Sequence, residues 1–135
     1  MIYSSAVVIL IKPSGKILMQ LRDDGGGKPI DYPNTWCFPG GEIEDDEKPI
    51  DAAVREIQEE TNIRIEPGSL IQIFTYDHDE TSEYIFVGFV PEDTVAKVLE
   101  GEAMEWLTFD EIAQLELAFE QAGVLPVLKP YLEDL

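Results

Sequence analysis

The sequence has few basic residues, and this shortage limits its partners. Nine lysines and arginines stand against 28 aspartates and glutamates in 135 residues, so the net charge is −19 and the pI is near 4.1. A surface this acidic repels phosphate backbones, which argues against nucleic-acid polymers and anionic membranes. It still admits a small nucleotide, because a bound divalent cation inverts the local field.

Cysteines and long apolar segments are also scarce. Cys37 is the single cysteine, so it forms no internal disulfide and builds no cysteine-rich zinc site. We therefore expect a reducing, cytoplasmic environment. The longest apolar run extends only from Ala6 to Ile11, which is too short for a membrane span and lacks the basic flank of a signal peptide.

The remaining composition is that of a globular domain with mixed secondary structure. No repeat or low-complexity linker divides residues 1–135, so we expect one domain. Apolar runs separated by turn signals predict strands at residues 7–11, 17–21, 69–76, 84–90 and 104–107. Helical spacing and capping signals predict helices at residues 49–61, 108–117 and, despite two prolines, 119–132. Residues 23–35 and the polar residues 77–83 are expected to be loops, and the whole predicts an α/β fold with a helix on each face of one sheet.

The predicted helix at residues 49–61 gathers acidic side chains. At about 100° per residue, Glu59 and Glu60 lie on either side of Glu56, so the three carboxylates share one face. Ala52 and Ala53 are expected one turn earlier on that side, leaving room above the carboxylates. Spacing alone leaves two interpretations open: a solvated acidic face, or a site for a hard cation such as Mg²⁺ that prefers oxygen ligands.

The segment from residue 41 to residue 63 resembles the Nudix box, G-x5-E-x7-R-E-U-x-E-E-x-G-U, in which U is a bulky aliphatic residue. The positions that fall on this pattern are Gly41, Glu47, Arg55, Glu56, Ile57, Glu59, Glu60 and Ile63. Asn62 departs from the pattern, because the family has glycine there. Asparagine also adopts the left-handed conformation that ends many helices, so we expect Asn62 to end this helix in that conformation.

The resemblance implies a single Nudix hydrolase domain over residues 1–135, with the family's α/β/α sandwich around a central mixed sheet. It implies hydrolysis of a phosphoanhydride bond with Mg²⁺ or Mn²⁺ as cofactor, which suits an anionic substrate that meets protein carboxylates. The implied metal ligands are Glu56, Glu59, Glu60 and the carbonyl of Gly40, and the implied catalytic residues are Glu56, Arg55 and Glu59. Glu47 is expected to support the loop, and some members recruit a further carboxylate, for which the candidates are Glu100 and Glu102.

The expected substrate is a small molecule in which a nucleoside diphosphate is linked to another group. Our first expectation is a nucleoside triphosphate, oxidised or not, that yields a nucleoside monophosphate and pyrophosphate. Nucleotide sugars and dinucleoside polyphosphates are the enzymatic alternatives, and a catalytically silent nucleotide-binding module on the same fold is the alternative from another class. We expect neither a nucleic-acid polymer nor a membrane as partner, and a homodimer stays open.

Two residues outside the box are candidates for substrate contacts. Arg22 follows the second strand, where it either holds a phosphate or pairs with a neighbouring aspartate. Tyr32 lies in the long loop and is a candidate to stack on a base. His78 is interpreted as an exposed loop histidine and Cys37 as a half-buried structural cysteine.

Overall fold

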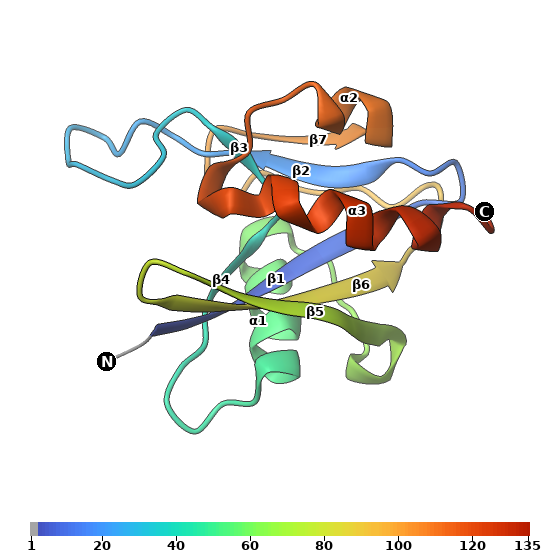
Figure 1. Cartoon of the computed structure of the whole chain (residues 1–135), viewed down its shortest axis with the longest axis horizontal. Coiled ribbons are helices and arrows are strands. Elements are labelled where there is room, and N and C mark those ends of the chain that lie inside the picture. Colours follow the sequence, from blue (N-terminus) through green and yellow to red (C-terminus); the bar gives the residue numbers. More distant parts are fainter. Residues whose placement is uncertain (1–2) are drawn as a thin grey trace.

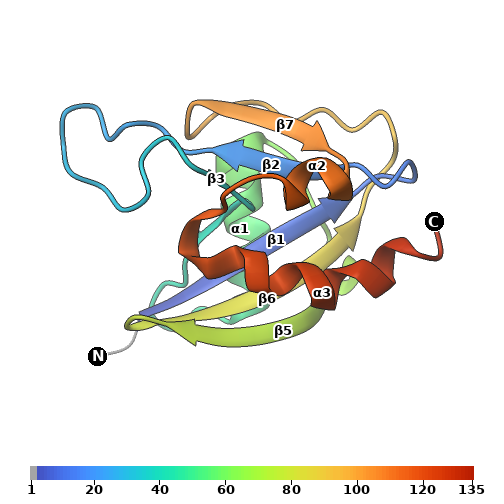
Figure 2. The same cartoon turned by 45° about the horizontal axis from the view of Figure 1, so that its top comes forward.

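The computed structural model describes residues 3–135, which form a seven-stranded mixed sheet with helices on both faces (Figures 1 and 2). The strand order is β3-β2-β1-β6-β5, and β4 and β7 pair with β1 and β2, respectively. The strands are β1 (Tyr3–Ile11), β2 (Ile17–Leu21), β3 (Trp36–Cys37), β4 (Gly40–Glu42), β5 (Leu70–His78), β6 (Thr81–Phe89) and β7 (Ala103–Leu107). The helices are α1 (Pro49–Thr61), α2 (Phe109–Ala113) and α3 (Leu125–Leu128), with 3-10 turns η1 (Pro67–Ser69), η2 (Ala118–Val124) and η3 (Lys129–Leu132).

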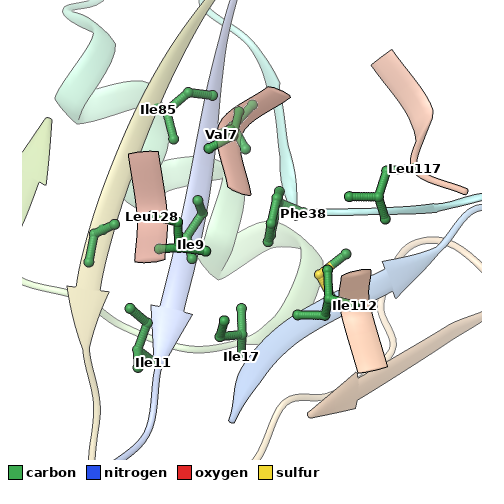
Figure 3. Packing of buried hydrophobic residues seen from close by; sticks show 12 residues of the cluster. Val7, Ile9, Ile11, Ile17, Phe38, Ile85, Ile112, Leu117 and Leu128 are labelled. Atoms are coloured by element: carbon green, nitrogen blue, oxygen red, sulfur yellow. The ribbon is translucent and has the colours of Figure 1, made fainter. Parts of the chain in front are cut away.

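Strand β1 is the centre of the sheet, and its side chains alternate between two cores. It pairs antiparallel with β2, as the predicted hairpin requires, and parallel with β6. Figure 3 shows Val7, Ile9 and Ile11 in the core that also contains Leu128 of α3. The alternate residues of β1 pack into a second core beneath α1. Because both faces of β1 are buried, the strand reads as a continuous apolar run, and the predicted α/β/α sandwich is confirmed.

Helix α1 begins and ends where the sequence predicts. Pro49 occupies its first turn, and Asn62 follows its last residue with φ 62° and ψ 19°, in the left-handed region. The expected shelf above the carboxylates is wrong, because Ala52 and Ala53 are fully buried in the core between α1 and the sheet. Small residues at these positions let α1 approach β1 closely, which brings its acidic residues to the end of the sheet.

Two other boundaries differ from the sequence prediction. Residues 77–83 are not a loop, because β5 runs to His78 and β6 begins at Thr81, with a tight turn between them. Cross-strand pairing, including a 2.6 Å hydrogen bond from the Ser82 hydroxyl to Asp77, keeps this polar stretch extended. Helix α2 begins with the predicted capping box at Thr108 but ends at Ala113, because the following chain turns to bring Leu117 beside β3.

The C-terminal segment is helical but broken into short pieces. Residues 119–132 do not form one helix, since η2, α3 and η3 follow one another and Pro126 and Pro130 lie in the first turns of the last two. This segment covers the face of the sheet opposite α1, as the two views in Figures 1 and 2 agree. No helix within residues 3–135 has the length and apolar character needed to cross a bilayer.

Candidate functional site

Three carboxylates from distant parts of the chain meet beside β4. Glu56 and Glu60 extend from α1, Glu100 comes from the segment before β7, and one oxygen of each lies within 4.8 Å of the others. Glu102, the other candidate for a further carboxylate, lies outside this cluster with its side chain exposed. Glu59 also lies outside it, and its side chain is 58% exposed. We call Glu56, Glu60 and Glu100 the acidic cluster.

Glu60 has the most unfavourable environment for a negative charge in the acidic cluster. It is only 2% exposed, and its Oε2 accepts a 3.2 Å hydrogen bond from the backbone N–H of Gly40. Burial, followed by the charges of Glu100 and Glu56, raises the pKa of Glu60 to about 9. A buried carboxylate among carboxylates is stabilised by a proton or by a cation, so this donor set fits a hard divalent ion.

Glycines allow the backbone of β4 to approach the acidic cluster. A side chain at Gly41 would collide with the carboxylate of Glu56, and one at Gly40 would collide with the carbonyl of Ala6 in β1. Both strand pairing and the contact with α1 therefore require residues without Cβ atoms at these positions. The same approach places the Gly40 peptide next to Glu60.

Arg55 connects α1 to the loop that precedes it. Its guanidinium forms two hydrogen bonds to Glu47, at 2.9 and 3.0 Å, and one of 2.9 Å to the carbonyl of Glu42. It also donates to Glu56 at 2.8 Å and to Glu59 at 3.2 Å. Hydrogen bonding to Arg55 lowers the pKa of Glu47. Arg55 thus fixes one oxygen of Glu56 and ties the loop to the helix.

A cavity of about 780 Å³ lies next to the acidic cluster. A smaller one, of about 190 Å³, is lined by Glu60 and Glu100 and shares Gln20, Arg22 and Gly40 with the larger. The larger cavity runs between the β5–β6 hairpin, the long loop and η2. The acidic cluster therefore adjoins the larger cavity.

The structure brings Arg22 and Tyr32 together at the wall of this cavity. The Nε of Arg22 donates to the carbonyls of Asp31 and Tyr32, at 3.1 and 3.2 Å, and its guanidinium carbon lies 4.9 Å from the centre of the Phe119 ring. The ring of Tyr32 meets Phe119 edge to face, with centroids 4.8 Å apart. Among the ion pairs of the described residues, Arg22 pairs with neither neighbouring aspartate. It instead holds the loop of residues 23–35, which extends past β2 and β3 in Figure 2.

His78 lies in a different place from the one predicted. It is not exposed in a loop but is the last residue of β5, 8% exposed, and lines the cavity next to the buried Glu83 of β6. The sequence contains a signal for the burial of Glu83. Glu83 alternates with Ile85 and Val87, so a carboxylate stands in a row of core residues.

Cys37 is buried in the interior of the protein, as a structural cysteine would be. Its thiol is buried and donates to the side chain of Gln20 at 3.7 Å. Burial, opposed by the charge of Arg22, raises the pKa of the thiol to about 12. Such a thiol stays protonated near neutral pH and is a poor nucleophile, in agreement with the structural interpretation.

Comparison with known proteins identifies the family of this chain. A family model described as the NUDIX domain matches residues 1–128. Diphosphoinositol polyphosphate phosphohydrolase 3-alpha of Mus musculus is 33% identical over 108 residues, which cover 77% of this chain and 63% of the relative. Diphosphoinositol polyphosphate phosphohydrolase 2 of Homo sapiens is 33% identical over 107 residues, covering 77% of this chain and 57% of the relative. The chain thus spans less than two thirds of these relatives.

Solved structures show the same fold at low sequence identity. The MutT NUDIX hydrolase of Burkholderia pseudomallei has a TM-score of 0.79 and 21% identity, with 95% of this chain and 98% of that one covered. The NUDIX domain of Shewanella oneidensis NrtR, solved with ADP ribose, has a TM-score of 0.79 and 16% identity, with coverages of 98% and 89%. The family match over residues 1–128, together with this fold, shows that the chain belongs to the NUDIX domain family.

Proposed function

We propose that this protein is a single-domain Nudix pyrophosphohydrolase that cleaves a phosphoanhydride bond in a nucleoside diphosphate-linked substrate. The first substrate we propose is a nucleoside triphosphate, oxidised or not, which yields a nucleoside monophosphate and pyrophosphate. The observation that carries the proposal is that the acidic cluster adjoins a cavity lined by Tyr32, Phe119 and Arg22. Phosphates and a planar base thus have adjoining places.

The acidic cluster and Gly40 would hold Mg²⁺ or Mn²⁺. When bound, the cation supplies positive charge to the diphosphate and acidifies water. Glu56 is the proposed acceptor for the proton of the attacking water, and Arg55 orients it through the 2.8 Å hydrogen bond. Arg22 lies between the acidic cluster and the aromatic wall, where its charge reaches a substrate phosphate. Glu59 lies outside the acidic cluster, so we propose that it acts on the cation indirectly, through Arg55, which donates hydrogen bonds to both Glu59 and Glu56.

The charge of the cavity favours a nucleotide over a diphosphoinositol polyphosphate, the substrate class in the names of the curated relatives. Arg22 is the one arginine or lysine among the described residues that line the larger cavity. The carboxylates that line it are Asp31, Glu42, Asp79, Glu80 and Glu83. A ring that carries many phosphates needs several cationic side chains, whereas a nucleoside moiety is neutral.

The other partners follow from the same charge. With a net charge of −19, we propose that the protein does not bind DNA or RNA polymers. Nucleotide sugars and dinucleoside polyphosphates also combine a diphosphate with a neutral base, so they remain in the substrate class to be tested. A silent binding module is disfavoured because the carboxylates of the box are present.

The test is a turnover panel with separation of the products. We expect Mg²⁺-dependent release of pyrophosphate from at least one nucleoside triphosphate, with nucleotide sugars, dinucleoside polyphosphates and a diphosphoinositol polyphosphate run alongside. Excess chelator should abolish the reaction, and added Mg²⁺ or Mn²⁺ should restore it, whereas Zn²⁺ should replace them poorly because the acidic cluster offers only oxygen ligands. Turnover in excess chelator would contradict the metal-dependent mechanism. Turnover of the diphosphoinositol polyphosphate alone would contradict the proposed nucleotide substrate.

A further inference from the structure

The floor of the larger cavity is a buried pair of polar side chains, His78 and Glu83. They come from the two strands of the β5–β6 hairpin, and their side chains are 6% and 4% exposed. Both line the cavity. Glu83 lies on the same face of β6 as Ile85, and its cross-strand partners are Ser5 and Tyr76. The pair is thus held by strands on both sides.

Three polar atoms of this pair lack hydrogen-bond partners within the described part of the chain. Nε2 of His78 lies 3.4 Å from Oε1 of Glu83, but neither ring nitrogen of His78 nor Oε2 of Glu83 makes a hydrogen bond. The nearest other carboxylates to Nδ1 of His78 belong to Asp79, at 3.4 Å, and Glu120, at 3.8 Å, and both are exposed. A buried polar atom without a partner is unfavourable, so such atoms in side chains that line a cavity point to a ligand that supplies the partner.

The cavity wall next to the pair is aromatic. The ring of Phe119 lies 5.9 Å from that of His78 and 4.8 Å from that of Tyr32. Phe119 and Glu120 both have positive φ angles, of 56° and 59°, and the hydroxyl of Tyr76 donates to the carbonyl of Phe119 at 2.9 Å. Consecutive left-handed residues are strained, and such strain is typical of ligand-binding sites.

We propose that His78 and Glu83 determine the base specificity of the hydrolysis, by accepting the N–H groups at the edge of a nucleobase whose ring lies against Phe119 and Tyr32. This inference rests on the proposed function. An ionised carboxylate only accepts hydrogen bonds, and the neighbouring imidazole stabilises its charge. The carboxylate of Glu83 is therefore the acceptor that the base meets, and His78, whose Nε2 lies 3.4 Å from it, positions it.

A carboxylate distinguishes the bases by their hydrogen-bonding edges. Guanine presents two adjacent donors, its imino and amino N–H groups, which match a carboxylate. Adenine and cytosine place a ring-nitrogen acceptor beside the amino group, and uracil places its single N–H between two carbonyl oxygens. An acceptor opposite a carboxylate is repelled and left unpaired, so the pair favours guanine nucleotides.

The test compares GTP, ATP, CTP and UTP for the wild type and for Glu83→Gln, His78→Gln and Asp77→Asn. The wild type should prefer GTP by about tenfold or more in kcat/KM. Glu83→Gln should lower kcat/KM for GTP by about tenfold while ATP stays within about threefold, and His78→Gln should change the ratio in the same direction. Asp77→Asn is the matched control, because Asp77 is exposed on the same hairpin and lies outside the cavity.

A second measurement separates this inference from the proposed function. Guanosine binds without phosphates and hence without a metal, so its affinity is measured by titration in chelator. Saturable binding that weakens about tenfold in Glu83→Gln but not in Asp77→Asn supports the pair as the base site, even if no nucleotide is hydrolysed. Hydrolysis with an unchanged base ranking in both cavity variants, or guanosine binding that is absent or indifferent to Glu83, overturns it.

Discussion

Glu60 and Glu83 are both almost fully buried carboxylates, yet their surroundings differ. Glu60 accepts a hydrogen bond from the backbone N–H of Gly40 but lies beside Glu56 and Glu100, whose charges repel a negative charge on it. Glu83 lies beside an imidazole, and although burial raises its pKa, His78 and Ser5 oppose that effect. The neighbours of Glu60 are carboxylates, whereas the neighbour of Glu83 is an imidazole. Burial alone therefore does not define what a carboxylate does; its neighbours do.

The sharpest way to break this comparison is to remove the charge of Glu60. Glu60→Gln keeps the shape of the side chain but cannot hold a cation strongly, so turnover of every nucleotide should fall by orders of magnitude, about a hundredfold or more, with no change in base ranking. In chelator the free energy of unfolding should rise by about 1–3 kcal/mol at pH 7. Burial raises the pKa of Glu60 to about 9, so folding of the wild type at pH 7 requires this carboxyl to take up a proton, whereas a glutamine does not have to.

Activity assays and thermal melting in chelator measure the two effects on Glu60→Gln. A parallel fall in turnover and in apo-protein stability would make Glu60 a structural residue. Glu83→Gln is the contrasting variant, since it should alter the ranking of the bases while the dependence on Mg²⁺ concentration stays that of the wild type. If the two variants behaved alike, the distinction between the two buried carboxylates would be wrong.

The parts of the molecule that sequence predicted well are those that depend on local interactions. The bounds of α1, the left-handed Asn62 and the capping box of Thr108 with Glu111 are all fixed by residues within a few positions of one another. The box pattern likewise places its acidic residues on one helix of known geometry. Such features can be predicted from sequence because the capping and turn-forming residues that define them act on neighbours a few positions away.

The parts that sequence predicted poorly depend on which distant strands lie side by side. Glu83 is buried because β6 pairs with β1, and the polar composition of residues 77–83 does not reveal that pairing, although the alternation of Glu83 with Ile85 and Val87 is a signal for burial. His78 follows it into the cavity for the same reason. The choice between Glu100 and Glu102 also needed the fold, since both residues are exposed and only Glu100 has a carboxylate oxygen within reach of Glu56 and Glu60.

The difference between Glu100 and Glu102 can also be tested, and its expected effect on turnover is smaller than that of Glu60→Gln. Glu100→Gln removes one carboxylate from the acidic cluster, so turnover should fall by about 10–100-fold and more Mg²⁺ should be needed for half-maximal activity. Glu102→Gln removes the same charge two residues away and should stay within about twofold of the wild type. Titration of activity with Mg²⁺ measures both variants. Equal losses would show that net charge near the site, rather than ligation, is responsible.

Asn62 gives the smallest effect and tests how firmly the end of α1 positions Glu60. At φ 62° a glycine has no Cβ penalty, but it also gains more entropy in the unfolded chain, and the two terms nearly cancel. Asn62→Gly should therefore change the free energy of unfolding by less than about 1 kcal/mol and turnover by no more than about threefold.

Asn62→Val should be less stable than the wild type and than Asn62→Gly, because a β-branched residue resists positive φ. Its strain lies two residues from Glu60 and far along the chain from Glu83, so turnover should fall while guanosine binding in chelator is retained. Thermal melting, turnover and guanosine titration of the two variants check this. A valine tolerated as well as glycine would show that the left-handed end of α1 does not hold the acidic cluster in place.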